Sequence, residues 1–225
     1  MTGPDPRLAG LVLAGGRSRR FGSDKAVALL DARPLLAWTA EALAGACGAV
    51  AVSAPPGSKA AVLAETLGLP VLADPPGAPD GPLAGVAAGA AWAIARGAER
   101  LALLPCDTPR VDAAIIVRLA AALGPADGVA AARTTDGLHA LCAVLRLDRV
   151  GALMETVAAG EHPPIAAIWA RMGLRPVDFE NAPAFLNLNR PEDLNRLLGA
   201  SPSGGGGPPQ AVEGAQGRDP GDRGA

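Results

Sequence analysis

The feature that most constrains the fold is an alternation of short apolar runs with longer stretches of helical pattern, separated by glycine and proline. The apolar runs predict strands at residues 8–14, 49–53, 70–73, 101–105, 128–132, 139–145 and 175–179. The stretches between and after them predict helices at residues 34–47, 58–67, 83–96, 112–123, 147–159, 163–172 and 191–198. Strands that alternate with helices in this way are typical of βαβ units. We therefore predict a three-layer α/β fold, with a mainly parallel twisted sheet and helices on both faces.

The chain divides into one domain and a tail. With 225 residues it is long enough for one ordinary α/β domain and short for two. We assign residues 1–200 to the domain. Residues 201–225 are rich in glycine and proline and hold almost no bulky apolar side chains. Such a segment cannot offset the entropy of ordering, so we expect a disordered tail.

Composition excludes several classes of protein. The formal net charge of -2 argues against nucleic-acid binding. No apolar run is long enough to span a membrane, and the N-terminus lacks the pattern of a signal peptide, so we expect a cytoplasmic protein. Cys47, Cys106 and Cys142 are widely spaced and form no CxxC pair, which makes a zinc site or a disulfide framework improbable.

The loop after the first predicted strand, AGGRSRRFGSDK, combines glycines with positive charge. Gly15 and Gly16 permit close approach of the backbone to a ligand. Cationic side chains follow them at Arg17, Arg19, Arg20 and Lys25. The loop is neither a Walker A motif nor a dinucleotide fingerprint. It is either a solvated basic turn or a phosphate-binding loop, and its place after a buried strand favours phosphate binding.

Polar residues also follow other predicted strands, at the sheet edge where α/β proteins bind ligands. Asp107 stands between two prolines in PCDTP and could ligate Mg²⁺, although an Asx turn is an alternative. Asp74 and the GPLAG loop that begins at Gly81 could contact a base or an anion, and Asp74 could equally form a turn. Asn187 and Asn189 would lie on one face of an extended segment, although Asn189 could cap a helix.

These motifs together resemble the molybdenum cofactor guanylyltransferases, members of the larger nucleotidyltransferase superfamily. LAGGRSRRFGSDKA, DGPLAG, PCDTP and FLNLNRPEDL occur in the family's order over about residues 8–198. The sequence departs from the family pattern at Ser53, where the family often has Asn, at Phe21, where Met is usual, and at His139-Ala140, where His-Pro is usual. The resemblance implies a Rossmann-like nucleotidyltransferase fold.

The resemblance also implies substrates and roles. The substrates would be GTP and the molybdopterin form of the molybdenum cofactor, with Mg²⁺ as the cofactor. The catalytic residues would be Arg19, Lys25 and Asp107, with Asp107 as the metal ligand. Asn187 and Asn189 would lie on the cofactor side of the pocket. The GTP-binding residues would be Leu13, Ala14, Gly15, Gly16, Lys25, Ser53, Asp74, Gly81 and Asp107.

Two alternative functions remain at this point. One is a related nucleotidyltransferase that uses CTP or a sugar phosphate. The other is a non-catalytic protein that binds a nucleotide and hands over the cofactor. We expect a monomer whose partners could include molybdoenzymes or proteins of upstream cofactor synthesis, with no nucleic acid and no membrane among them.

Overall fold

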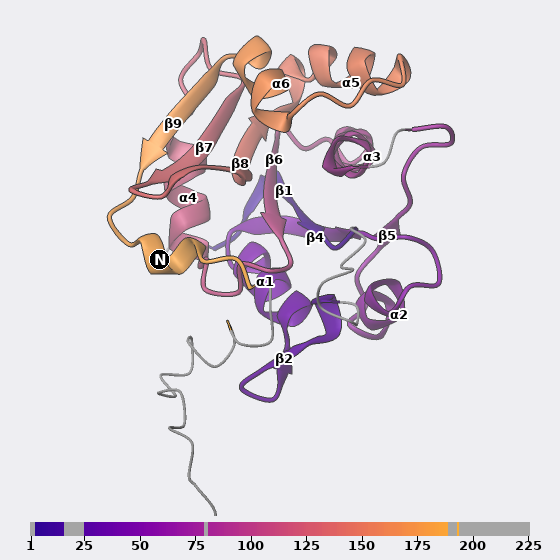
Figure 1. Cartoon of the computed structure of the whole chain (residues 1–225). Coiled ribbons are helices and arrows are strands. Elements are labelled where there is room, and N and C mark those ends of the chain that lie inside the picture. The colour runs from indigo at the N-terminus through magenta and orange to yellow at the C-terminus, as the bar shows by residue number, and fades with distance from the viewer. Residues whose placement is uncertain (1–2, 16–24, 79–80, 189–192, 194–225) are drawn as a thin grey trace, which may run out of the picture.

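A seven-stranded sheet forms the centre of the molecule in a computed structural model that describes residues 3–15, 25–78, 81–188 and 193 (Figure 1). Its strand order is β5-β4-β1-β6-β8-β7-β9. The strands are β1 (Asp5–Leu13), β4 (Cys47–Ser53), β5 (Val71–Leu72), β6 (Arg100–Pro105), β7 (Val129–Thr134), β8 (Gly137–Arg146) and β9 (Leu174–Asp178). A small separate hairpin consists of β2 (Leu29–Leu30) and β3 (Arg33–Pro34).

Helices cover both faces of this sheet (Figure 1). One face packs against α1 (Leu35–Ala44), α2 (Lys59–Thr66) and α4 (Ala113–Ala122). The other packs against α3 (Pro82–Ala95), α5 (Gly151–Ala158) and α6 (Ile165–Met172). Because both faces are covered, the last six residues of β1 are all buried. None of the helices in the described residues is long and apolar enough to cross a membrane.

The sheet is parallel except at β8. Strand β1 pairs in parallel with β4 and β6, β4 with β5, and β7 with β9. Strand β8 runs antiparallel between β6 and β7, because the tight turn after β7 returns the chain directly. The register of β7 with β8 shifts between Ala131 and Ala132. Within this irregular stretch, the Ala140 carbonyl accepts a hydrogen bond of 2.7 Å from the indole N–H of the fully buried Trp169.

The predicted fold class is confirmed, with differences at the ends of elements. The first strand begins at Asp5 and not at residue 8, because its pairing with β4 starts there. The predicted helix 147–159 splits into a 3-10 turn, η2 (Leu147–Arg149), and α5. The helix predicted to begin at Pro163 begins at Ile165, after a second proline at its N-cap. The predicted helix 191–198 and the predicted tail lie outside the described residues, apart from one helical residue at Asp193.

Candidate active site

The carboxyl ends of β1, β4 and β6 lie level with one another. Leu13 is in register with Ser53 on one side and with Pro105 on the other. The Ala14 amide donates to the Ser53 carbonyl at 2.9 Å, and the Cys106 amide donates to the Leu13 carbonyl at 3.0 Å. The chain proceeds from β1 outward through β4 and β5 and then returns to β6 on the other side of β1. This reversal makes the β1–β6 edge the position where sheets of this kind bind ligands.

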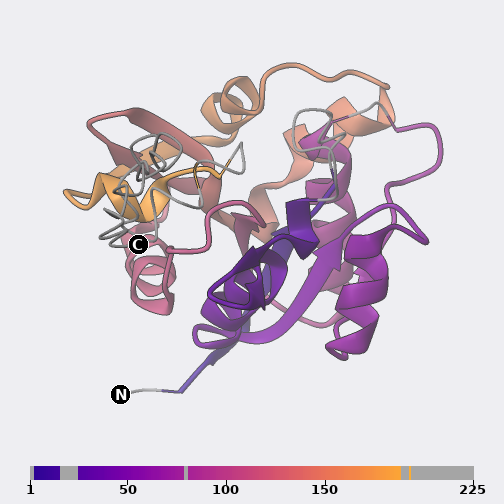
Figure 2. The ribbon, with the colours of Figure 1, turned by 60° about the horizontal axis from the view of Figure 1, so that its bottom comes forward.

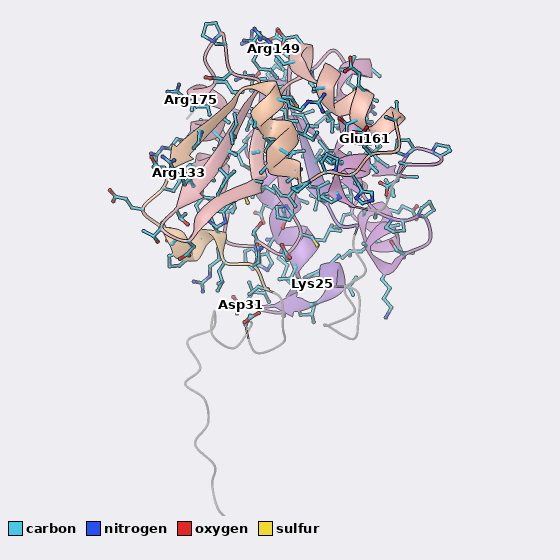
Figure 3. The ribbon with its side chains drawn as sticks, turned by 45° about the horizontal axis from the view of Figure 1, so that its top comes forward. Lys25, Asp31, Arg133, Arg149, Glu161 and Arg175 are labelled. Carbon is cyan, nitrogen blue, oxygen red and sulfur yellow. The ribbon has the colours of Figure 1, made fainter. Side chains whose placement is uncertain are left out.

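Lys25 and Asp107 meet at this edge. Lys25 begins the short 3-10 helix η1 (Lys25–Val27), and Asp107 follows β6 by two residues. The Lys25 Nζ lies 3.0 Å from the Asp107 Oδ2, and side-chain exposures of 12% and 20% leave both groups largely shielded from water. Figure 3 shows Lys25 on the side of the molecule opposite Arg149. The structure thus joins two of the predicted catalytic residues across 82 positions of sequence.

The second carboxylate oxygen of Asp107 has a different environment. Oδ1 is buried, and no hydrogen-bond donor reaches it within the part of the chain that the structure describes. A buried carboxylate oxygen without a donor is costly unless a cation or an outside donor satisfies it. The described residues contain no group of three or more His, Cys, Asp and Glu side chains that could hold a metal ion by themselves. A cation at Oδ1 would therefore need further ligands from phosphate oxygens and water, which suits Mg²⁺.

Hydrogen bonds fix the turn that carries Asp107. The Thr108 hydroxyl donates to the Pro105 carbonyl at 3.0 Å, and the Val111 amide donates to the Thr108 carbonyl at 3.3 Å. From the other side, the Leu188 amide donates to the Asp107 carbonyl at 2.9 Å. The turn is therefore held at residues before, at and after Asp107. This arrangement gives the carboxylate a fixed direction.

The first turn of α3 approaches β4 closely at the same edge. Gly81 is the N-cap of α3 with a φ of 134°, a value that favours glycine, and Pro82 occupies the first turn. A Cβ atom at Gly85 would lie 2.3 Å from the Ser53 hydroxyl oxygen and 3.2 Å from the Ser53 Cβ, so any larger residue there would displace Ser53. Ser53 is buried beneath the helix. Contact of Ser53 or Gly81 with a nucleotide stays a prediction.

The remaining predicted residues fall into two groups. Asp74 lies exposed after β5, and Asn187 lies exposed beside the Leu188 amide that contacts the Asp107 turn. Gly16, Arg19 and Asn189 lie outside the described residues.

The structure gives no support to Cys47 or Cys142 as a nucleophile. Cys47 and Cys142 are buried free thiols, and burial raises the pKa of each to about 12. Both thiols are therefore neutral at physiological pH. Cys142 also forms a hydrogen bond with Thr108 in the Asp107 turn, which makes it part of the packing below that turn.

Sequence reasoning missed the β2–β3 hairpin and its neighbours. Leu30 of the hairpin, Leu35 of α1 and Leu188 form a small buried cluster next to the Asp107 turn. A pocket of about 480 Å³ lies beside them, lined in part by Asp31, Trp38 and Pro109. The sequence does carry one sign of this cluster, which is the apolar Leu188 between two asparagines. In an extended segment successive side chains point to opposite sides, so Leu188 would point inward where the asparagines point outward.

The sequence is similar to known proteins over most of its length. Residues 10–177 match the model of the family described as the MobA-like NTP transferase domain. A molybdenum cofactor guanylyltransferase of Cereibacter sphaeroides is 42% identical over 192 residues, which cover 84% of this chain and 95% of that protein. The molybdenum cofactor guanylyltransferase of Rhodobacter capsulatus is 41% identical over 194 residues, which cover 84% of this chain and 94% of that protein.

A solved structure shows the same fold. The molybdopterin-guanine dinucleotide biosynthesis protein A of Archaeoglobus fulgidus superposes with a TM-score of 0.66 at 20% identity, covering 84% of this chain and 95% of that one. At this identity the likeness concerns the arrangement of strands and helices alone.

Proposed function

We propose a function from one premise: this chain belongs to the family of MobA-like NTP transferases. The function is transfer of GMP from GTP to the molybdopterin form of the molybdenum cofactor, which yields the guanine dinucleotide cofactor and pyrophosphate. Relatives at 36–42% identity that carry the name molybdenum cofactor guanylyltransferase support this substrate pair. The single observation that carries it is the Asp107 carboxylate, which meets Lys25 at the edge between β1 and β6.

The proposed chemistry is an in-line displacement at the α-phosphorus of GTP. A terminal phosphate oxygen of the pterin substrate forms a bond to the α-phosphorus. The bond from that phosphorus to the oxygen bridging toward the β-phosphorus breaks, and its electron pair leaves with pyrophosphate. Because the attacking oxygen is already anionic, no strong general base is needed. The chemistry also needs no cysteine nucleophile, and the thiols of Cys47 and Cys142 are buried and neutral.

Positioning and charge stabilisation are then the main tasks of the protein. Lys25 would hold phosphate oxygens with its ammonium group while Asp107 Oδ2 keeps that group at the edge of the sheet. Asp107 would hold Mg²⁺ through Oδ1, the buried oxygen that meets no donor in the described residues. A bound Mg²⁺ would neutralise negative charge on the triphosphate and on the departing pyrophosphate. Arg19, which lies outside the described residues, would add positive charge to the same phosphates.

The base and the acceptor would lie on opposite sides of this centre. The Leu13 carbonyl and the Ala14 amide already form hydrogen bonds within the sheet, so guanine recognition by backbone groups falls to the Ala14 carbonyl and to Gly15. Asp74 and the Gly81 turn would border the base on the β5 side. Asn187, on the far side of Asp107, would contact the pterin substrate. The proposed location of the reaction is the cytoplasm.

Pyrophosphate release tests the function. The purified protein is incubated with Mg²⁺ and each of the four NTPs, with and without a molybdopterin-loaded acceptor. We expect release with GTP and only when the acceptor is present. Release with CTP would be compatible with the fold and the mechanism but would contradict the assignment of guanine as the base. GTP binding with no release from any nucleotide would indicate a non-catalytic cofactor-handover protein.

A further inference from the structure

The chain that follows β9 returns to the carboxyl edge of the sheet. Residues 179–188, here called the strap, pass through the 3-10 turn η3 (Ala182–Phe185) and end beside the Asp107 turn. Figure 1 and Figure 2 both show this orange segment beside α4 and the strands β7 and β8. The strap belongs to no strand of the sheet, so buried side chains and single backbone hydrogen bonds hold it in place.

Phe185 is the first anchor of the strap. Its side chain is almost fully buried and stacks on His139 of β8, with ring centroids 4.8 Å apart and ring planes 22° apart. Phe179 lies on it at a centroid distance of 5.2 Å. His139 is held in turn by a 2.8 Å hydrogen bond between its Nε2 and the Thr134 hydroxyl. Aromatic contacts of this kind add stabilisation beyond the area they bury, so the middle of the strap is fixed to the sheet.

Leu188 is the second anchor and the one that contacts the site. Its side chain is fully buried against Leu30 of the hairpin and Leu35 of α1. Its backbone amide donates to the Asp107 carbonyl at 2.9 Å. The buried Leu188 side chain therefore fixes the position of the Leu188 amide, and this amide in turn binds the backbone carbonyl of Asp107, the proposed metal ligand. Leu186, two residues earlier, has the same side chain but is 43% exposed.

We propose that Leu188 is a positioning residue for nucleotidyl transfer. Asp107 Oδ1 meets no donor in the described residues, so its direction depends on the backbone turn and on the Lys25 contact at Oδ2. The Leu188 amide fixes that turn on the side facing the strap. Loss of the buried side chain would let the amide and the Asp107 carbonyl separate, and the carboxylate would lose its alignment. This inference rests on the proposed function for the role of Asp107.

The test compares two leucine truncations in the same segment. Leu188→Ala removes the anchor, and Leu186→Ala removes an exposed leucine and serves as the matched control. Leu188→Met keeps about the same side-chain volume and should retain most of the wild-type activity. Leu188→Val is a milder truncation that provides the answer if Leu188→Ala does not fold. Far-UV circular dichroism and thermal melting establish which variants are folded.

Two readouts separate positioning from simple loss of packing. The first is kcat and KM for GTP in the transfer assay. We expect Leu188→Ala to lower kcat by roughly 10²-fold, the scale of a displacement of about 1 Å in a reacting geometry, with KM for GTP little changed. The second is the binding of Mn²⁺, a paramagnetic substitute for Mg²⁺, in the presence of GTP without acceptor. Leu188→Ala and Leu188→Val should weaken Mn²⁺ binding, and Leu186→Ala should not.

The outcomes are distinct. Folded Leu188 variants with the kcat and Mn²⁺ affinity of the wild type would overturn the inference, as would equal effects of Leu186→Ala and Leu188→Ala. If the wild type releases no pyrophosphate with any nucleotide, the proposed function fails. The Mn²⁺ comparison would still decide whether Leu188 positions Asp107.

Discussion

The two edges of the sheet use charged residues in opposite ways. At the amino edge of β6, Arg100 lies 2.6 Å from Asp5, and at the end of β8, Arg146 lies 2.6 Å from Asp148. Arg100, Arg146 and Asp148 line a cavity of about 550 Å³. At the carboxyl edge, the Oδ2 of Asp107 forms an ion pair with Lys25. The Oδ1 of Asp107 is buried and accepts no hydrogen bond from the described residues.

The difference shows that cavity size is a poor guide to the site in this protein. The larger cavity is bordered by cations that already have carboxylate partners, so an anionic ligand would gain little there. The carboxyl edge offers a carboxylate oxygen that something outside the described residues would have to satisfy. A cation or another outside group bound at the Asp107 Oδ1 would satisfy this oxygen.

The largest effect should come from removing the Asp107 carboxylate. Asp107→Ala should lower turnover by at least ~10²-fold, because it removes a preorganised electrostatic group from the reacting centre. Asp148→Ala, which breaks an ion pair at the amino edge, should leave turnover near the wild-type value. Steady-state pyrophosphate release measures both. Equal losses in the two variants would contradict the division between the edges.

Lys25 gives the next largest effect. Lys25→Ala should lower turnover by about 10²-fold, since it removes the ammonium group that forms an ion pair with Asp107. Lys59→Ala removes an exposed lysine at the start of α2 and is the matched control. Rates at saturating GTP distinguish the two variants. Near-normal turnover of a folded Lys25→Ala variant would remove Lys25 from the mechanism.

The turn between β2 and β3, near the carboxyl edge, contains strained backbone. Among the described residues, the non-glycine residues with positive φ are Asp31 at 50° and Ala32 at 59°, both in the turn between β2 and β3. Ala32→Gly should stabilise the fold by roughly 1 kcal/mol, because glycine adopts this conformation without the steric cost. Ala91→Gly, at an exposed position inside α3, should destabilise it by about 1 kcal/mol. Urea unfolding compares them, and two shifts of the same sign would contradict the strain.

The smallest effect concerns pH. Burial lowers the pKa of His139 below its usual value, although Asp136 opposes this shift. A group with a lowered folded-state pKa binds fewer protons when folded, so its contribution to stability is present above the unfolded-state pKa and is lost as the pH falls below about 6.5. His139→Gln should reduce this dependence of the melting temperature between about pH 7.5 and 5.5. An unchanged slope would show that other groups cause it.

Much of the fold follows from local sequence pattern. The apolar runs and the Gly and Pro boundaries predicted all strands of the main sheet. The signal is strongest for central strands such as β1 and β6, because strands covered on both faces are apolar over most of their length. The helix predicted over residues 112–123 forms with Asp112 as its N-cap, and the Asp112 Oδ1 accepts from the Ile115 amide at 2.9 Å. The β2–β3 hairpin escaped prediction because each strand has only two residues and its turn contains Asp-Ala where glycine would be expected.

The site was predictable at the level of residues but not of contacts. Asp107 and Lys25 were expected at one edge, because the carboxyl ends of parallel strands meet there. That they form a direct ion pair, and that one Asp107 oxygen remains buried without a donor, depends on packing over long sequence separations. Leu188 could not be recognised from sequence as a support of Asp107, because its amide acts through a backbone hydrogen bond that any residue could form.

The fate of a phosphorus label tests the central claim most directly. GTP labelled at the α-phosphorus and GTP labelled at the γ-phosphorus are each incubated with the protein, Mg²⁺ and the molybdopterin-loaded acceptor. Attack at the α-phosphorus predicts that the α label enters the acceptor and that the γ label appears in pyrophosphate, with both transfers lost in Asp107→Ala. Transfer of the γ label to the acceptor, or unchanged transfer by Asp107→Ala, would contradict the assignment of this edge as the centre of nucleotidyl transfer.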